Sequence, residues 1–153
     1  MIGVSLKATS GIASIARLEI ERLDRKCVRV RYIATATQGR KLKKILYAVT
    51  GLIQGFVLMP FYPIVHVHQA SRGSFYRKLP MYLWGFLLKK KVILHLHGGG
   101  FVDFYRDADP VTQRLIRYVL NHVSLVMVLY QDEAFRVLEF SNPKRVEVLT
   151  NGR

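Results

Sequence analysis

Residues 92–101 read VILHLHGGGF, an apolar run that ends in three consecutive glycines. Such a run is typical of a buried strand in a parallel sheet that leads into a tight turn. Residues 64–68 read IVHVH and repeat the pattern upstream. Residues two apart on a strand share a face, so each run places two histidines on one face. If the two runs are neighbouring strands, four imidazoles gather near one edge of the sheet.

Strand-like and helix-like segments alternate along the whole chain. The pattern predicts an α/β fold: a single Rossmann-like domain whose mostly parallel sheet of about six strands has helices on both faces. A length of 153 residues suits one domain. The expected strands are 1–5, 28–34, 64–68, 92–97, 124–129 and 145–149. The expected helices are 12–25, 39–59, one that opens in the turn 69–78 and runs to about 88, 110–121 and 132–140. Residues 101–109 are expected to form a loop, and 150–153 a turn.

The composition narrows the class of protein. Half of the residues are hydrophobic, which excludes a mainly disordered chain. Lys and Arg number 24 against 10 Asp and Glu, so the formal charge is +14 and polyanions are the favoured partners. The single cysteine, Cys27, excludes an internal disulfide framework and fits a reducing compartment. Its place before an apolar run predicts a buried small residue.

The first residues do not have the pattern of a secretory signal, but a later segment raises a membrane question. Residues 45–64 carry no charge and follow the basic cluster 40–44. The segment is just long enough to span a bilayer. It also contains two glycines and two prolines, and its last residues open the next strand. We therefore expect a helix packed on the sheet or lying in the membrane interface rather than a span.

The loop after the first strand predicts an anion site. Ser10 is a candidate N-cap of the following helix, and Gly11 allows close backbone approach. Free N–H groups and the helix dipole both favour a phosphate at such a place. The sequence contains neither GxGxxG nor GxxxxGK[ST], so a dinucleotide fingerprint and a P-loop are both excluded.

A second candidate loop follows the strand at 64–68. Ser71, Gly73 and Ser74 can satisfy free N–H groups of the next helix, while nearby basic residues bring positive charge. An ordinary helix cap with solvated charges would look the same. We favour a functional loop because it follows the carboxyl end of a strand expected at the centre of the sheet, where open α/β sheets place their ligands.

Five pieces of the sequence, in order, resemble glycosyltransferase family 4, the retaining enzymes of the GT-B architecture. Residues 10–13 resemble the glycine-containing loop after the first strand, and 64–68 resemble the "DVVHVH" strand. Residues 71–78 resemble the "GSFYRK" loop of a polysaccharide-building branch. Residues 92–98 resemble "VILHLHG", and 148–152 resemble the "VLPNGV" that closes the amino-terminal domain. The resemblance covers nearly all of the chain, and it implies the amino-terminal half of a GT-B fold.

This resemblance implies transfer of a sugar from a nucleotide-diphosphate sugar to a polysaccharide or lipid-linked acceptor, with retention of the anomeric configuration. It places His97 beside the transferred sugar as the catalytic residue. The donor side would be held by Ser10, Gly11 and Gly98, and the substrate on the acceptor side by His68, Arg72, Ser74, Arg77 and Lys78. No metal and no separate cofactor are expected, because helix termini and basic side chains neutralise the leaving diphosphate in these folds.

Two departures from the family pattern matter. The first loop usually has two small residues such as Gly-Gly, where this chain has Ser10-Gly11. The carboxyl-terminal domain, which holds the nucleotide pocket, is missing from the sequence. We therefore expect little catalysis by this chain alone, and a carboxyl-terminal domain as its partner. The expected location is cytoplasmic, with peripheral contact to anionic lipid on the inner face of the plasma membrane.

Three other functions deserve comparison. His97-Gly98-Gly99-Gly100 resembles the oxyanion-hole motif of an esterase branch, but the G-x-S-x-G elbow is absent downstream. The four histidines could hold a metal, although no cysteine or carboxylate cluster near them in the sequence completes a set of ligands. We expect His66 and His95 to be hydrogen-bonded and neutral within the sheet.

A binding module without catalysis is the remaining alternative. Nucleic acid is disfavoured, because residues 75–78 are the only patch where aromatic and basic residues interleave. Attachment to anionic lipid fits the charge better and also fits a transferase with a lipid-linked acceptor.

Overall fold

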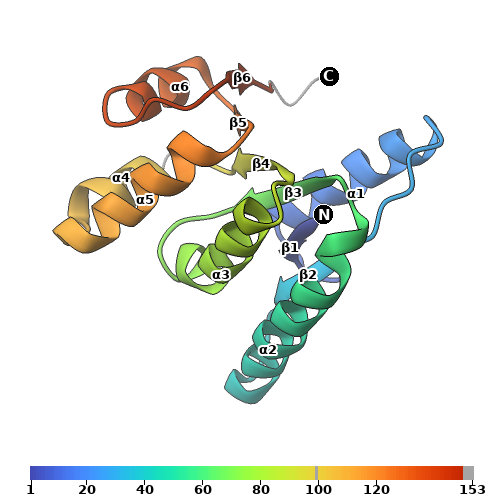
Figure 1. Ribbon diagram of the computed structural model, residues 1–153. Helices are drawn as coiled ribbons and strands as arrows, with labels where there is room; N and C mark the ends of the chain where they lie inside the picture. The colour runs from blue at the N-terminus through green and yellow to red at the C-terminus, as the bar shows by residue number, and fades with distance from the viewer. Residues whose placement is uncertain (99, 150–153) are drawn as a thin grey trace.

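The computed structural model describes residues 1–98 and 100–149, which form one six-stranded sheet with every strand pair parallel (Figure 1). The strand order is β2-β1-β3-β4-β5-β6. The predicted α/β, Rossmann-like fold is confirmed. Residues 150–153, where the sequence predicts a turn, lie outside the described part.

The elements alternate as expected. The strands are β1 (Ile2–Val4), β2 (Ile33–Ala36), β3 (Ile64–Gln69), β4 (Lys91–Leu96), β5 (Leu125–Val128) and β6 (Val146–Val148). The helices are α1 (Gly11–Asp24), α2 (Lys41–Leu58), α3 (Gly73–Leu87), α4 (Gly100–Asp107), α5 (Pro110–His122) and α6 (Gln131–Leu138), with a short 3₁₀ helix η1 (Met59–Phe61) after α2.

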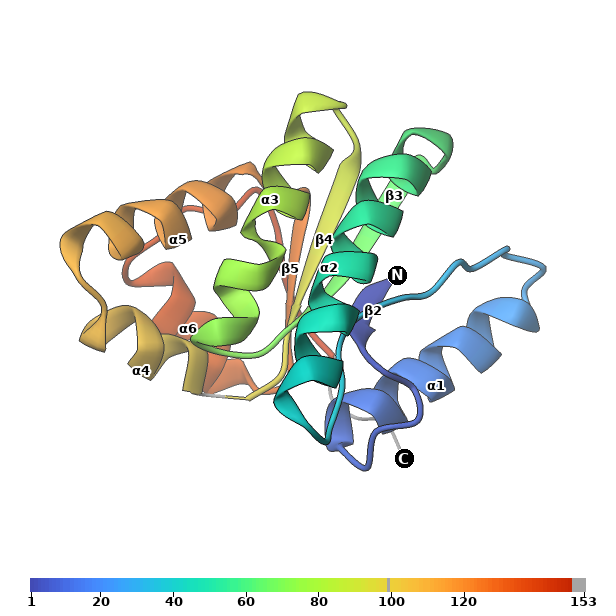
Figure 2. The ribbon, with the colours of Figure 1, turned by 90° about the horizontal axis from the view of Figure 1, so that it is seen from below.

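The two faces of the sheet differ in chemistry. Helix α1 lies on one face, while α2, α3 and α5 cover the opposite face (Figures 1 and 2). On the side of α3, strands β3 and β4 present buried apolar residues, among them Val67, Leu94 and Leu96. On the side of α1 the same strands present histidines. Alternation along each strand produces this division, because neighbouring residues point to opposite faces.

Strand β2 begins later than the sequence predicts. The alternation at 28–34 indicated a strand there, but pairing with β1 begins at Ile33 and extends to Ala36. The reason is the shortness of β1: its three residues provide pairing partners only for this part of the chain. The predicted burial of Cys27 is also wrong. Cys27 is exposed in the turn after α1, in a left-handed backbone conformation with φ 58°.

The predicted loop at 101–109 is mostly helix α4. Phe101, Val102 and Phe104 are buried in the core. Burial of these side chains stabilises a helix of only eight residues. The Ser10 cap that the sequence predicts is confirmed, and a second cap is found at Asp109. The Ser10 hydroxyl accepts a hydrogen bond from the Ala13 N–H, and the Asp109 carboxylate accepts from Val111 and Thr112 at the start of α5.

Helix α2 packs through glycines and leaves most of its length exposed. A Cβ atom at Gly51 would lie 2.6 Å from the Ala34 carbonyl oxygen in β2. A Cβ atom at Gly55 would lie 2.6 Å from the end of the Met81 side chain in α3. The segment Lys41–Phe61 is long and apolar enough to cross a membrane by length and composition. Only 17% of its apolar 18-residue window is buried. The glycine contacts hold it against the sheet.

The glycine contacts make a paired prediction. Gly51→Ala should lower the free energy of unfolding by about 1–3 kcal/mol, because the new methyl group meets backbone that cannot move aside. Gly55→Ala should cost little, since the end of Met81 can rotate away and alanine favours the helix by about 1 kcal/mol. Urea unfolding of both variants measures the difference. Equal stability of the two variants would contradict this packing of α2.

Candidate functional site

Four histidine rings gather on one face of β3 and β4, as the sequence predicts. The ring centroids of His66 and His68 are 4.7 Å apart, and those of His95 and His97 are 4.1 Å apart. The two pairs also contact each other, since the His68 and His97 centroids are separated by 5.1 Å. The register of β3 against β4 produces the cluster, because it sets His68 directly beside His95.

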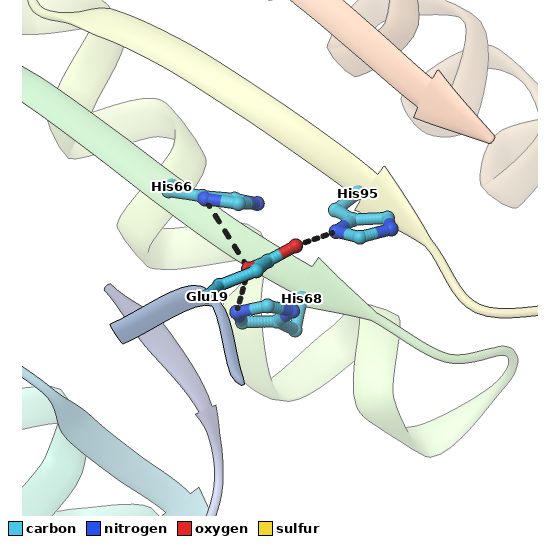
Figure 3. Close-up of side chains that lie close together, drawn as sticks. All are labelled: Glu19, His66, His68 and His95. Atoms are coloured by element: carbon cyan, nitrogen blue, oxygen red, sulfur yellow. Dashed lines mark ion pairs between the residues drawn. The ribbon is translucent and has the colours of Figure 1, made fainter. Parts of the chain in front are cut away.

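A glutamate completes the cluster. Glu19 reaches in from α1, with Oε1 at 3.1 Å from His95 Nδ1 and Oε2 at 3.4 Å from His68 Nε2 (Figure 3). His66 Nδ1 lies 3.9 Å from Oε2. The sequence shows no cysteine or carboxylate cluster near the histidines that would complete a set of ligands, and Glu19, which is distant from them in the sequence, corrects that expectation. The available signal was spacing: Glu19 follows the buried residues Ala13 and Ala16 at intervals of three along α1.

Burial favours the neutral form of three of the four histidines, His66, His68 and His97. His68 and His95 are fully buried. Burial lowers the pKa of His66 to about 4 and that of His97 to about 3, and it holds the pKa of His68 well below its ordinary value. The prediction that His95 is hydrogen-bonded is wrong: neither of its ring nitrogens has a hydrogen-bond partner among the described residues. His66 Nε2 has none either.

The residues after β3 divide into exposed and buried groups. Arg72 is exposed, with φ 47°, and its guanidinium forms an ion pair with Asp107 at 2.9 Å. Arg77 is also exposed, on α3. Ser74 and Lys78 are buried, and the Lys78 ammonium donates to the Ser74 hydroxyl (2.8 Å) and to the His68 carbonyl oxygen. Burial, assisted by the neighbouring Arg77 charge, lowers the pKa of Lys78 to about 7.

The glycine loops remain open. A Cβ atom at Gly11 or at Gly98 would meet no atom of the described residues within 4 Å, so these residues leave the backbone open to a ligand at both positions. Gly98 has φ +97°, a conformation that glycine adopts readily. These loops follow β1 and β4, and the loop at 70–72 follows β3. All three therefore lie at the carboxyl edge of the parallel sheet.

A second buried carboxylate lies near this edge. Glu133 in α6 is buried, and its Oε2 accepts a hydrogen bond from the Leu129 N–H at 3.4 Å. Burial raises its pKa, with partial compensation from that hydrogen bond. The sequence pattern does not distinguish Glu133 from an ordinary helix residue, because an acidic residue in the first turn of a helix is usually stabilised by the helix dipole.

Comparisons with known proteins add no relative. No protein-family model matches this chain, and no curated protein matches it.

The buried histidines predict loss of stability in acid. In the presence of EDTA, which removes any bound metal ion, the free energy of unfolding should fall as the pH is lowered from 6.5 to 4. The titration of His66 alone should account for about 3 kcal/mol of this loss. The unfolded chain takes up protons near pH 6.5, whereas folded His66 does so only near pH 4, so the unfolded state is favoured as the pH falls. Urea midpoints from pH 7 to pH 4 measure this effect.

His66→Asn should reduce that pH dependence. His122→Asn, which removes an exposed histidine from α5, should leave it unchanged. A wild-type chain whose stability is constant from pH 7 to pH 5 would contradict the lowered pKa of His66 in the folded chain.

Proposed function

We propose that this chain is the acceptor-side domain of a retaining glycosyltransferase of the GT-B architecture. It takes part in sugar transfer from a nucleotide-diphosphate sugar to a polysaccharide or lipid-linked acceptor. One observation carries the proposal. Three segments that carry the resemblance, residues 10–13, 71–78 and 92–98, converge on the carboxyl edge of an all-parallel sheet, and that edge is where open α/β sheets bind ligands.

The donor side is suited to a diphosphate. Gly11 begins α1, a helix of 14 residues, and its backbone is open to approach. The positive end of the helix dipole favours an anion there. Ser10 caps the helix through its hydroxyl, which orients the first turn. Gly98 offers a second open stretch of backbone at the end of β4. The nucleotide itself would be bound by a carboxyl-terminal domain.

His97 is suited to contact the transferred sugar. It follows β4 and is half-buried, whereas His68 and His95 are fully buried. Its Nε2 shares a hydrogen bond of 2.9 Å with His68 Nδ1, which fixes the orientation of the ring. Its Nδ1 has no partner among the described residues but is shielded from solvent, so a sugar hydroxyl reaches it only if the ring moves. On the acceptor side, exposed Arg72 and Arg77 are available to contact substrate, and buried Lys78, Ser74 and His68 hold their loop in place.

Sugar transfer tests the proposal. The protein is expressed from its whole reading frame and incubated with radiolabelled uridine or guanosine diphosphate sugars and membrane lipid acceptors. His97→Ala should lower the transfer rate by about 100-fold, the typical loss when one polar contact to the transition state is removed. His122→Ala is the matched control and should be fully active. An inverted anomeric product, or full activity of His97→Ala, would contradict the proposal.

A second function, attachment to an anionic membrane, is favoured by the surface of α2. Its large exposed apolar side chains are Leu42, Ile45, Leu46, Val49, Ile53, Phe56 and Val57. Four exposed basic residues, Arg40, Lys41, Lys43 and Lys44, lie at its start. A helix with an exposed apolar side and a basic end is suited to lie in the interface of an anionic membrane. Because α2 follows β2, its basic end lies at the same edge of the sheet as the glycine loops.

Vesicle sedimentation tests membrane attachment. The chain should sediment with vesicles that contain phosphatidylserine and remain soluble with vesicles of phosphatidylcholine alone. Reversal of two charges in Lys43→Glu/Lys44→Glu should weaken binding by about tenfold or more, at about 1 kcal/mol for each charge near the surface. Arg114→Glu/Arg117→Glu, on α5, changes the net charge equally and should bind like the wild type. Equal losses in both variants would indicate a general charge effect without a docking surface.

A further inference from the structure

The carboxylate of Glu19 is buried, and no Lys or Arg side chain of the described residues forms an ion pair with it. Both oxygens are shielded from solvent, and neither has a hydrogen-bond partner among the described residues. Its ion-pair contacts in that part of the chain are all with histidines: His66, His68 and His95. His68 Nε2 and His95 Nδ1, which face it, also lack hydrogen-bond partners among those residues. A carboxylate in such surroundings is costly unless a cation is present.

The hydrogen bond between His68 and His97 adds to the electrostatic cost of burying the Glu19 carboxylate. When His68 donates from Nδ1 to His97 Nε2, a bond of 2.9 Å, the neutral His68 ring has a lone pair on Nε2. That nitrogen faces Glu19 Oε2 at 3.4 Å. Two acceptors then face each other inside the protein. A cation between them converts the repulsion into two favourable contacts.

The arrangement fits a metal ion. Glu19, His66, His68 and His95 can each offer one ligand atom such that all four atoms lie within 4.8 Å of one another. Tetrahedral zinc, with bonds of about 2.0–2.1 Å, needs ligand atoms roughly 3.3 Å apart. The Glu19 contacts are close to this separation, at 3.1 Å from Oε1 to His95 and 3.4 Å from Oε2 to His68. They start from two different oxygens, and the set of four ligand atoms spans up to 4.8 Å, so the side chains draw together when the ion binds. The set of three imidazoles and one carboxylate suits zinc, whereas Mg²⁺ and Ca²⁺ prefer oxygen ligands alone.

We propose that Glu19, His66, His68 and His95 bind one Zn²⁺ ion that fastens α1 to strands β3 and β4. His97 then supports the ligand His68 through the other ring nitrogen, an arrangement common around metal-bound histidines. Four protein ligands close the site, so the ion has a structural role. It is separate from the sugar transfer proposed above, whose diphosphate is neutralised at the helix terminus.

The packing of α1 explains what the ion contributes. The fully buried side chains of α1 are those of Ala13 and Ala16, which are small. Its larger apolar residues, Ile15 and Ile20 among them, are only half-buried, so the apolar contact of α1 with the sheet is modest. Zinc ligation by Glu19 adds to this attachment. It also fixes the position of Ser10 and Gly11 at the start of the same helix.

Metal titration of the chain tests the site. The purified chain is treated with EDTA, exchanged into metal-free buffer and titrated with Zn²⁺ against a chromogenic chelator. We expect one Zn²⁺ per chain and a higher unfolding temperature with Zn²⁺ but not with Mg²⁺. Co²⁺ should bind with the intense visible absorption of a tetrahedral site. No stoichiometric binding of either ion would overturn the proposal.

Variants locate the ion. Glu19→Gln and His66→Asn should each weaken Zn²⁺ binding by at least about 100-fold, because a direct ligand contributes more than the supporting residues whose loss costs 10- to 100-fold. His122→Asn and Cys27→Ser remove exposed ligand types outside the cluster and should bind like the wild type. Wild-type affinity in both cluster variants, or loss of binding in Cys27→Ser, would overturn the proposal.

Stability without metal separates lost binding from lost folding. In the presence of EDTA, Glu19→Gln should unfold at a temperature equal to or above that of the wild type, because it removes an uncompensated buried charge. Circular dichroism measures this midpoint. A Glu19→Gln chain that is markedly less stable than the wild type in EDTA would show that the carboxylate is already compensated, which would overturn the proposal. Since these measurements involve no sugar, failure of the transferase proposal would leave them unaffected.

Discussion

The register between β3 and β4 is the constraint on which the rest of the structure depends. It pairs His68 with His95 and Val67 with Leu94, so polar and apolar residues separate onto opposite faces of the sheet. A slip of one residue in either strand would turn its histidines into the apolar layer beneath α3. The apolar face binds its helices through ordinary burial. The face that carries histidines needs another kind of partner.

Helix α1 packs against the face that carries the histidines, through small side chains and one charged side chain. Ala13 and Ala16 let it approach the sheet closely, and Glu19 then reaches the imidazoles. The attachment of α1 combines partial burial of apolar side chains with the contacts of Glu19. The consequence extends to the edge of the sheet, because Ser10 and Gly11 at the start of α1 move with the helix. A ligand at those residues and the histidine cluster are coupled through one rigid element.

The sequence predicted the fold well, because periodicity is a local property. The runs at 64–68 and 92–97 locate β3 and β4, and their spacing predicts the grouped histidines. Errors arose where tertiary packing decides. The aromatic residues of α4 form a helix because the core accepts them, and β2 is placed by its partner β1. Glu19 was missed because a glutamate on a helix usually faces water, and only the packing of α1 on β3 reveals otherwise.

Lys78 lies in the segment that the sequence selects, but the contacts of its side chain differ from the predicted contact with substrate. The sequence proposed it as a cation for substrate, in a loop rich in basic residues. Its ammonium is buried and bonded to the Ser74 hydroxyl and the His68 carbonyl oxygen. It therefore joins α3 to the end of β3, directly behind the histidine cluster. Arg72 and Arg77 are exposed on the same segment, and under the proposed function they are the residues that contact substrate. A rigid inner layer that holds an exposed outer layer is the arrangement that accurate positioning of a substrate requires.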